Sequence, residues 1–135
     1  MSPASAREAL LAAIADEGIG AIPGLLRDWA VEDAVNEWPQ SGERIRGVAN
    51  IERLYATYES ATGTSPHFTL GEVRGENPLV IEGTIDYGDG VPVRYVGIAE
   101  FRGSKVARMT EYFANPFEAP AWRAELVERM EPVTA

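Results

Sequence analysis

Residues 31–42 read VEDAVNEWPQSG, and the predicted fold is built outward from them. The stretch begins with the composition of a β-strand, and Pro39 and Gly42 mark the turn that ends it. Side chains alternate along a strand, so one face carries Val31, Asp33, Val35 and Glu37. A carboxylate between two valines is explained if this face opens onto an apolar cavity. The alternative is an exposed acid at the strand end, or one paired with an arginine.

Segments with helical periodicity lie before and after this strand in the sequence. The sequence predicts helices over about 6–17 and 21–29 before it, and a third over 48–61 after it. The third has an apolar stripe formed by Val48, Ile51, Leu54, Tyr55 and Tyr58. Tyr58 fits core packing, whereas Tyr55 fits either the core or a pocket wall.

The second half of the sequence is rich in strands. We expect strands at His67–Arg74, Leu79–Tyr87, Val91–Arg102 and Lys105–Phe113, followed by a helix near 121–130. Helices first and a long run of hairpins last predict a single α+β domain over 1–135, with helices packed on one face of an antiparallel sheet.

Turn positions predict which strand residues face each other. A loop at Gly103-Ser104 would pair Phe101 with Val106, Ile98 with Met109, and Val96 with Glu111. A loop at 88–90 would pair Ile85 with Val93. Both sheet faces then carry apolar residues, and each face needs another structural element packed against it. Helices cover one face, and we expect a second copy of the chain to cover the outer face in a homodimer.

Composition restricts the function classes. The net charge is −9, which disfavours binding to nucleic acid or to an anionic membrane. Without cysteine, and with His67 as the single histidine, the sequence has no metal constellation of the usual kind. No segment is apolar and long enough to span a membrane, and no signal peptide is recognisable, so we expect a cytoplasmic protein.

The element order and several motifs resemble the nuclear transport factor 2-like superfamily. EWPQSGERIRG and EYFANPFEAPAW are similar to segments of SnoaL-like bacterial proteins. Ketosteroid isomerases of this superfamily carry the run V-E-D-P-V-G-x-E-P-x-S-G. It is matched here by Val31, Glu32, Asp33, Val35, Pro39, Ser41 and Gly42. The resemblance implies a cone-shaped α+β fold, in which N-terminal helices lie on the concave face of a curved sheet and enclose a pocket.

The same resemblance implies roles for individual residues. Asp33 corresponds to the general base, and Tyr55 to a tyrosine that supports the oxyanion hole. The family's two oxyanion donors are not matched, because the first helix has no tyrosine and the strand position corresponds to Gly97 or Ile98. Glu111 corresponds to a pocket-facing position. It fits either a second catalytic acid or a buried ion pair with Arg94 or Arg108.

The resulting hypothesis is a pocket for a hydrophobic, carbonyl-bearing small molecule. Catalysis would be cofactor-independent isomerisation, cyclisation or dehydration with Asp33 as base. Epoxide hydrolysis is a weaker option, and a non-catalytic binding or interaction module of the same fold is the alternative. The expected catalytic residues are Asp33, Glu111 and Tyr55; the expected pocket lining is Val35, Trp38, Tyr58, Arg94, Val96, Ile98, Met109 and Phe113.

Overall fold

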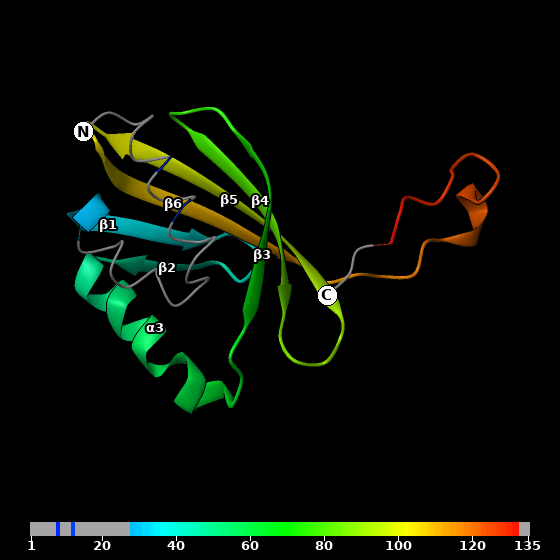
Figure 1. Ribbon diagram of the computed structural model, residues 1–135, viewed down its shortest axis with the longest axis horizontal. Helices are drawn as coiled ribbons and strands as arrows, with labels where there is room; N and C mark the ends of the chain where they lie inside the picture. The colour runs from blue at the N-terminus through cyan, green and yellow to red at the C-terminus, as the bar shows by residue number, and fades with distance from the viewer. Residues whose placement is uncertain (1–7, 9–11, 13–27, 133–135) are drawn as a thin grey trace.

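A twisted sheet with one long helix along its edge makes up the body of the molecule (Figure 1). The computed structural model describes residues 28–132 together with Glu8 and Ala12. The helices expected over 6–17 and 21–29 lie outside the described residues, apart from Glu8, Ala12, Asp28 and Trp29, which are helical. In the described part, no helix is long and apolar enough to cross a membrane.

Six strands form one sheet in the order β2-β1-β6-β5-β4-β3. Their bounds are β1 Ala30–Trp38, β2 Glu43–Arg46, β3 His67–Arg74, β4 Leu79–Asp86, β5 Pro92–Arg102 and β6 Lys105–Ala114. Neighbouring strands are antiparallel except β1 and β6, which run parallel. The expectation of a wholly antiparallel sheet is therefore wrong at this pairing, because a helix and three strands, and no hairpin, separate β6 from the β1–β2 unit.

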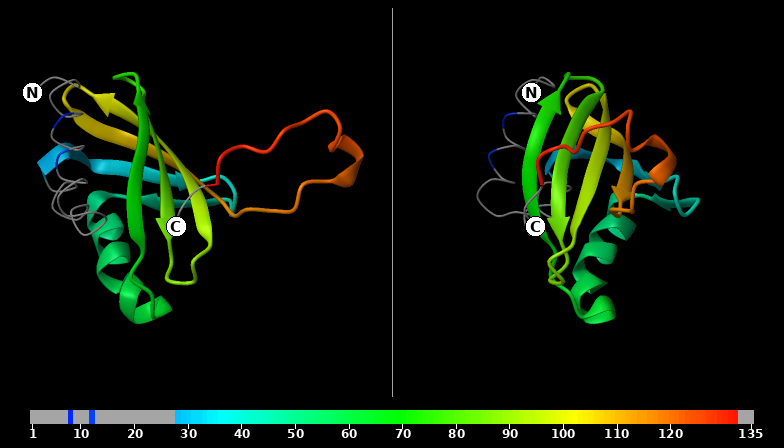
Figure 2. Two further views of the ribbon diagram at one scale, coloured as in Figure 1. Left: turned by 45° about the vertical axis from the view of Figure 1, so that its right-hand side comes forward. Right: turned by 90° about the vertical axis from the view of Figure 1, so that its right-hand side faces the viewer.

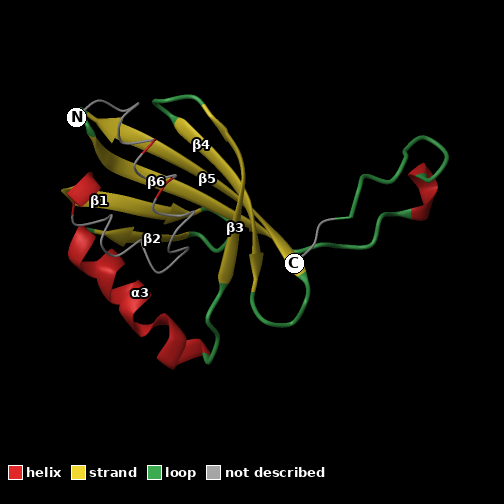
Figure 3. Cartoon of the chain, viewed as in Figure 1, coloured by secondary structure: helices red, strands yellow, loops and turns green. Residues whose placement is uncertain are grey.

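Helix α3 spans Val48–Thr62 and is the main helix of the described chain (Figure 3). It ends at Gly63, whose left-handed backbone lets its N–H bond the Glu59 carbonyl. Ile51 is buried and packs with Ala30 and Ala34 of β1. We call the sheet face that carries Ala34 and contacts α3 the inner face, and the opposite one the outer face.

The main core lies over the strands farther from α3. Its fully buried members are Leu79, Ile81, Ile85, Val93, Tyr95 and Ala99. Along β4 and β5 these residues alternate with more exposed ones, as the two-residue period of a strand requires. The Tyr95 ring meets Phe68 edge-on, with ring centroids 5.4 Å apart. This packing fixes the position of Tyr95.

Several predicted elements need correction. The strand β2 was not expected, since residues 43–46 carry three charged side chains and no strand pattern. The helix expected over 121–130 is a single 3-10 turn at Ala121–Arg123, and residues 124–130 are exposed, so in the described chain no other segment packs against them to stabilise a helix.

The β5–β6 register also differs from expectation beyond its turn. Phe101 does pair with Val106, but an irregularity at Glu100/Phe101 shifts the ladder by one residue. Glu111 consequently lies opposite Gly97, where Val96 was expected. The shift moves Glu111 to the face that carries Tyr95. The β4–β5 register matches the expected pairing of Ile85 with Val93.

Candidate functional site

The inner face holds a buried carboxylate surrounded by neutral hydrogen-bond donors. Glu111 is 6 % exposed. Its Oε1 accepts hydrogen bonds from Asn36 Nδ2 at 2.9 Å and Trp38 Nε1 at 3.0 Å, and its Oε2 accepts one from the Tyr95 hydroxyl. Three converging donors fit an ionised, acceptor-only carboxylate. Within the described chain no arginine or lysine forms an ion pair with Glu111, so the expected partnership with Arg94 or Arg108 is wrong.

Gly97 makes the Tyr95–Glu111 hydrogen bond possible. Tyr95 and Gly97 are two residues apart on β5 and share the inner face, and Glu111 lies opposite Gly97 on β6. A methyl group at position 97 would collide with the Tyr95 hydroxyl and with Met109 Cε. The missing side chain thus leaves the space through which the phenol reaches the carboxylate.

The tyrosines near Glu111 are held in their neutral form. Burial raises the pKa of Tyr95 well above its ordinary value, and the charge and hydrogen bond of Glu111 raise it further. Burial, followed by the charge of Glu111, also raises the pKa of Tyr55. Burial raises the pKa of Tyr87 to about 12, with Tyr58 and Glu111 adding to the effect. These phenols therefore remain hydrogen-bond donors across the physiological pH range.

Asn36 offers an acceptor that no protein group uses. Its side chain is 3 % exposed, and within the described chain its Oδ1 atom is buried without a hydrogen-bond partner. Rotating the amide by half a turn would direct this oxygen at the Glu111 carboxylate, so the Nδ2 donation to Glu111 fixes the orientation. An unsatisfied buried carbonyl costs about 1–3 kcal/mol. A bound molecule with a donor group would remove that penalty.

Asp33 lies on the outer face, and the expectation that it is sheltered from water is wrong. Its side chain is 75 % exposed, and its Oδ1 accepts a 3.0 Å hydrogen bond from Arg102. The predicted alternation holds from Ala34 onward, with Ala34 and Asn36 on the inner face, but the register of β1 shifts between Ala30 and Val35, and Glu32 and Asp33 are both exposed. Val31 packs against the cluster around Ile51, whereas Val35 lines the open groove of the outer face, so the two valines do not enclose Asp33 in a cavity.

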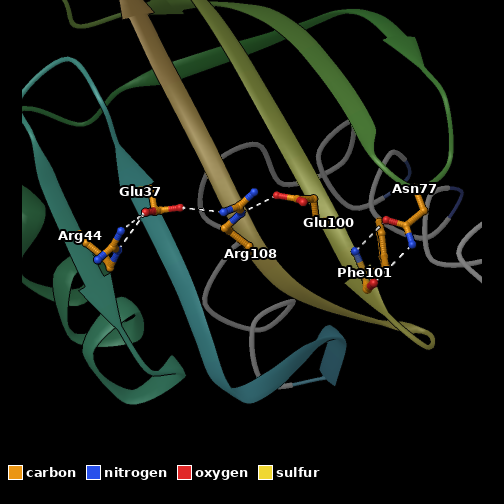
Figure 4. A network of polar contacts seen from close by, with 6 residues as sticks. All are labelled: Glu37, Arg44, Asn77, Glu100, Phe101 and Arg108. Atoms are coloured by element: carbon orange, nitrogen blue, oxygen red, sulfur yellow. Dashed lines mark hydrogen bonds and ion pairs between the residues drawn. The ribbon is translucent and has the colours of Figure 1, made fainter.

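Ion pairs cross the outer face from β2 to β5 (Figure 4). Arg44 donates to Glu37, Arg108 lies 3.4 Å from the other Glu37 oxygen, and Arg108 also donates to Glu100. The hydrogen bond from Arg44 is the main cause of the lowered pKa of Glu37. Farther along the sheet, the Asn77 side chain bonds both backbone groups of Phe101. Arg44, Glu37 and Arg108 also line an open groove of about 630 Å³ on this face.

The predicted pocket residues divide between the two faces. Trp38, Met109 and Phe113 lie on the inner face near Glu111 or Tyr95. Val35 lines the outer groove. Arg94, Val96 and Ile98 alternate with the buried residues of β5 and so point outward, which contradicts their expected place in the pocket. Tyr55 and Tyr58 are half-buried on α3, and Tyr55 packs with the cluster around Ile51. His67 is exposed.

Sequence reasoning missed Asn36 and Tyr95 as site residues. Asn36 is not among the residues that match the ketosteroid isomerase run, and the expected pairing of Val96 with Glu111 places Tyr95 on the face opposite Glu111. One available signal was that Asn36 and Trp38, two residues apart on a strand, each carry a hydrogen-bonding side chain on the same face. In the described part of the chain, no group of three or more acidic or histidine side chains could hold a metal ion.

Comparison with solved structures identifies the family. A protein of unknown function from Burkholderia xenovorans LB400, described as NTF-2 like, is 37 % identical; the match covers 93 % of this chain and 95 % of that one, with a TM-score of 0.73. This protein belongs to the NTF2-like family. No family model and no curated protein matches its sequence.

More distant structures share the NTF2-like fold of this protein. A candidate ketosteroid isomerase from Kribbella flavida is 24 % identical over 95 % of this chain and 92 % of that one, with a TM-score of 0.78. TerC co-crystallised with polyporic acid is also 24 % identical, over 83 % of this chain and 92 % of that one, with a TM-score of 0.66. Both likenesses agree with the α+β sheet described above.

Proposed function

We propose that this NTF2-like protein binds an apolar small molecule against the inner-face cluster of Asn36, Trp38, Tyr55, Tyr95 and Glu111. The observation that carries the proposal is that Asn36 Oδ1 lies buried beside Glu111 without a hydrogen-bond partner in the described chain. Buried polar groups are ordinarily paired, and an exception calls for an unseen partner. A ligand hydroxyl or other donor group fits this acceptor, while the surrounding aromatic rings suit an apolar body.

Structures of the same fold give this proposal general support. One relative of known structure was solved with trimethylamine and another with polyporic acid, so the fold accommodates small ligands. For the present chain we infer an apolar ligand that has a carbonyl and a hydrogen-bond donor. The donor group of the ligand would bond to Asn36 Oδ1, and the ligand carbonyl would accept a hydrogen bond from a neutral tyrosine hydroxyl.

The chemistry we propose is cofactor-independent proton transfer. The Glu111 carboxylate has about four acceptor positions, and three are occupied, so one remains for a ligand proton. Glu111 would take a proton from the carbon next to the ligand carbonyl. The electrons of that C–H bond would move toward the carbonyl oxygen, which the Tyr55 hydroxyl would stabilise, since the Tyr95 proton is already donated to Glu111. Returning the proton to a second carbon completes an isomerisation, and attack of the enolate on another carbonyl gives a cyclisation.

A second candidate is binding without catalysis. The three donors that already bond the Glu111 carboxylate favour it, because they leave little room for a reacting group of the ligand to reach the carboxylate oxygens. In that case the cluster would serve only to orient a ligand. Binding is common to both candidates and is tested first.

The binding test compares two probes that differ only in their donor. The first is para-hydroxybenzylideneacetone, an enone with a phenol group, and the second is its methyl ether. Calorimetric titration of the wild-type protein should show at least tenfold tighter binding of the phenol, as expected for pairing a buried acceptor. Asn36→Leu should remove the preference, while Arg94→Leu on the outer face should keep it. Equal affinity for the two probes in the wild-type protein contradicts the proposed use of Asn36.

A further inference from the structure

The buried Glu111 carboxylate is bonded by neutral groups alone. Its donors are the amide of Asn36, the indole of Trp38 and the phenol of Tyr95, and its side chain is 6 % exposed. These residues come from β1, β5 and β6, three strands that lie side by side in the sheet (Figure 2). Buried charges in proteins are ordinarily paired with an opposite charge or a metal ion. Glu111 therefore has hydrogen bonds but no group in the described chain that compensates its charge.

The basic side chains of the described residues lie away from this carboxylate. Arg108 is engaged by carboxylates of the outer face, and Arg94 points outward from β5. Arg123 and Arg129 belong to the segment 115–132, which extends away from the sheet (Figure 2). The ion pairs of the described chain all involve other acids. A cation at the inner face would therefore have to come from a ligand.

The neighbouring tyrosines are affected by the uncompensated charge. Burial is the main cause that raises the pKa values of Tyr55, Tyr87 and Tyr95, and the charge of Glu111 adds to each of these shifts. No basic side chain of the described residues acts in the opposite direction. An environment that disfavours a phenolate favours a positive charge in the same place. The aromatic part of the inner face thus suits a cation.

Asn36 Oδ1 supplies a free acceptor next to this charge. The atom is buried without a partner in the described chain, and Nδ2 of the same amide bonds Glu111. An N–H group that donates to Oδ1 is therefore held close to the carboxylate. Calcium or magnesium would need six or more oxygen ligands, whereas the groups around Glu111 are mostly donors. An organic ammonium needs only an acceptor, an opposite charge and apolar surroundings.

We propose that the ligand of the inner-face cluster is a protonated primary or secondary amine with an apolar body. One N–H would donate to Asn36 Oδ1, and the positive charge would lie beside Glu111. The rings of Trp38 and Tyr95 would add cation–π attraction. The Phe113 ring, with its centroid 5.5 Å from that of Tyr95, extends the aromatic surface for the apolar body. This inference names the donor group of the ligand and rests on the proposed ligand site, but it does not require that Glu111 acts as a base.

Two probes of the same shape test the role of charge. Phenethylamine and phenethyl alcohol share one apolar body and both have a donor, but at about pH 7.5 only the amine is positively charged. Calorimetric titration of the wild-type protein should show about tenfold or greater preference for the amine, as expected for a hydrogen-bonded ion pair at a buried site. Glu111→Gln should remove the preference. Asp33→Asn is the matched control, since it removes one exposed carboxylate from the outer face, and it should keep the preference. Circular dichroism checks the fold of both variants.

Nuclear magnetic resonance locates the amine without any change to Glu111. The chain has three tryptophans, and the indole N–H of Trp38 donates to Glu111. Phenethylamine should shift the Trp38 indole resonance of the wild-type protein, which Trp38→Phe assigns by its disappearance. The resonance of Trp122, whose side chain is 77 % exposed, should stay in place.

Three results would each overturn the inference. They are equal affinity of the wild-type protein for the two probes, a preference for the amine that survives in folded Glu111→Gln, and amine binding that leaves the Trp38 resonance unmoved. If the enone phenol is nevertheless preferred over its methyl ether, the ligand site at Asn36 stands and only its charge preference is wrong. If that preference is absent as well, the proposed ligand site itself is contradicted.

Discussion

The Tyr95 hydroxyl donates a hydrogen bond to Glu111 Oε2 across the space that Gly97 leaves open. Glu111 is paired with Gly97 in the β5–β6 ladder, and Tyr95 reaches it diagonally from two residues away. This relationship joins the strand register to the chemistry of the site. It also explains why Tyr95 and Gly97 should respond to mutation together.

Tyr95→Phe should lower the free energy of unfolding by about 1–3 kcal/mol, because it leaves a buried carboxylate oxygen without its donor. The ring and its packing on Phe68 are preserved, so the loss reports the hydroxyl. Urea unfolding measures the change. Tyr112→Phe is the control: its side chain is 38 % exposed, and a change of less than about 0.5 kcal/mol is expected. Equal losses in the two variants would contradict the assigned hydrogen bond.

Gly97→Ala should disturb the same hydrogen bond from the other side. The new methyl group would displace the Tyr95 hydroxyl and Met109 Cε. In the Tyr95→Phe background the hydroxyl is absent, so the alanine should be less destabilising than in wild type. A double-mutant cycle by urea unfolding should give a coupling of about 0.5 kcal/mol or more. Simple additivity of the two losses would show that Gly97 does not make room for the phenol.

The buried tyrosines predict that stability falls in alkaline solution. Burial raises the pKa of Tyr87 to about 12 from an ordinary value of 10.0. The pKa values of Tyr55 and Tyr95 are raised as well. Above pH 10 the unfolded chain then releases protons that the folded chain retains, so the free energy of unfolding decreases as pH rises.

Urea unfolding at several pH values between about 9 and 12 measures this slope. Tyr87→Phe should make the slope less steep, because it removes one group that titrates differently in the two states. The same slope in the variant and in wild type would contradict the raised pKa of Tyr87.

Asp33→Asn should leave the free energy of unfolding unchanged within error. The ion pair of Asp33 with Arg102 joins two side chains that are 75 % and 61 % exposed, and water and salt screen such a pair. Thermal unfolding at low and high salt provides the measurement. A clear loss of stability at both salt concentrations would place Asp33 in a more sheltered environment than the structure shows.

The sequence predicted the helix α3 and five of the six strands closely, because those segments have clear periodicity and turn residues. The two-residue alternation was also right for β1 from Ala34 onward, but alternation does not say which face is inside. That choice is made by Ile51 of α3 packing on Ala34, a contact between distant segments. Asp33 was therefore assigned to the wrong side of the sheet.

The predicted position of Glu111 was wrong for a different reason. The turn at Gly103-Ser104 predicted the first pairing of β5 with β6 correctly. The irregularity at Glu100/Phe101 leaves no mark in the hydrophobic pattern, yet it moves every later residue of β6 by one position. Without knowledge of this irregularity, the sequence does not place Tyr95 and Glu111 on the same face of the sheet.

Proton exchange into a ligand tests most directly whether Glu111 is the reactive acid. The probe is para-hydroxybenzylideneacetone in deuterated buffer, and nuclear magnetic resonance follows deuterium uptake at the carbon next to the carbonyl. We predict uptake by the wild-type protein at a rate well above that of buffer. Glu111→Gln should slow it by about 10²–10⁴-fold, whereas Asp33→Asn should exchange as wild type. Unchanged exchange in Glu111→Gln, or a loss confined to Asp33→Asn, would contradict the assignment of Glu111 as the base.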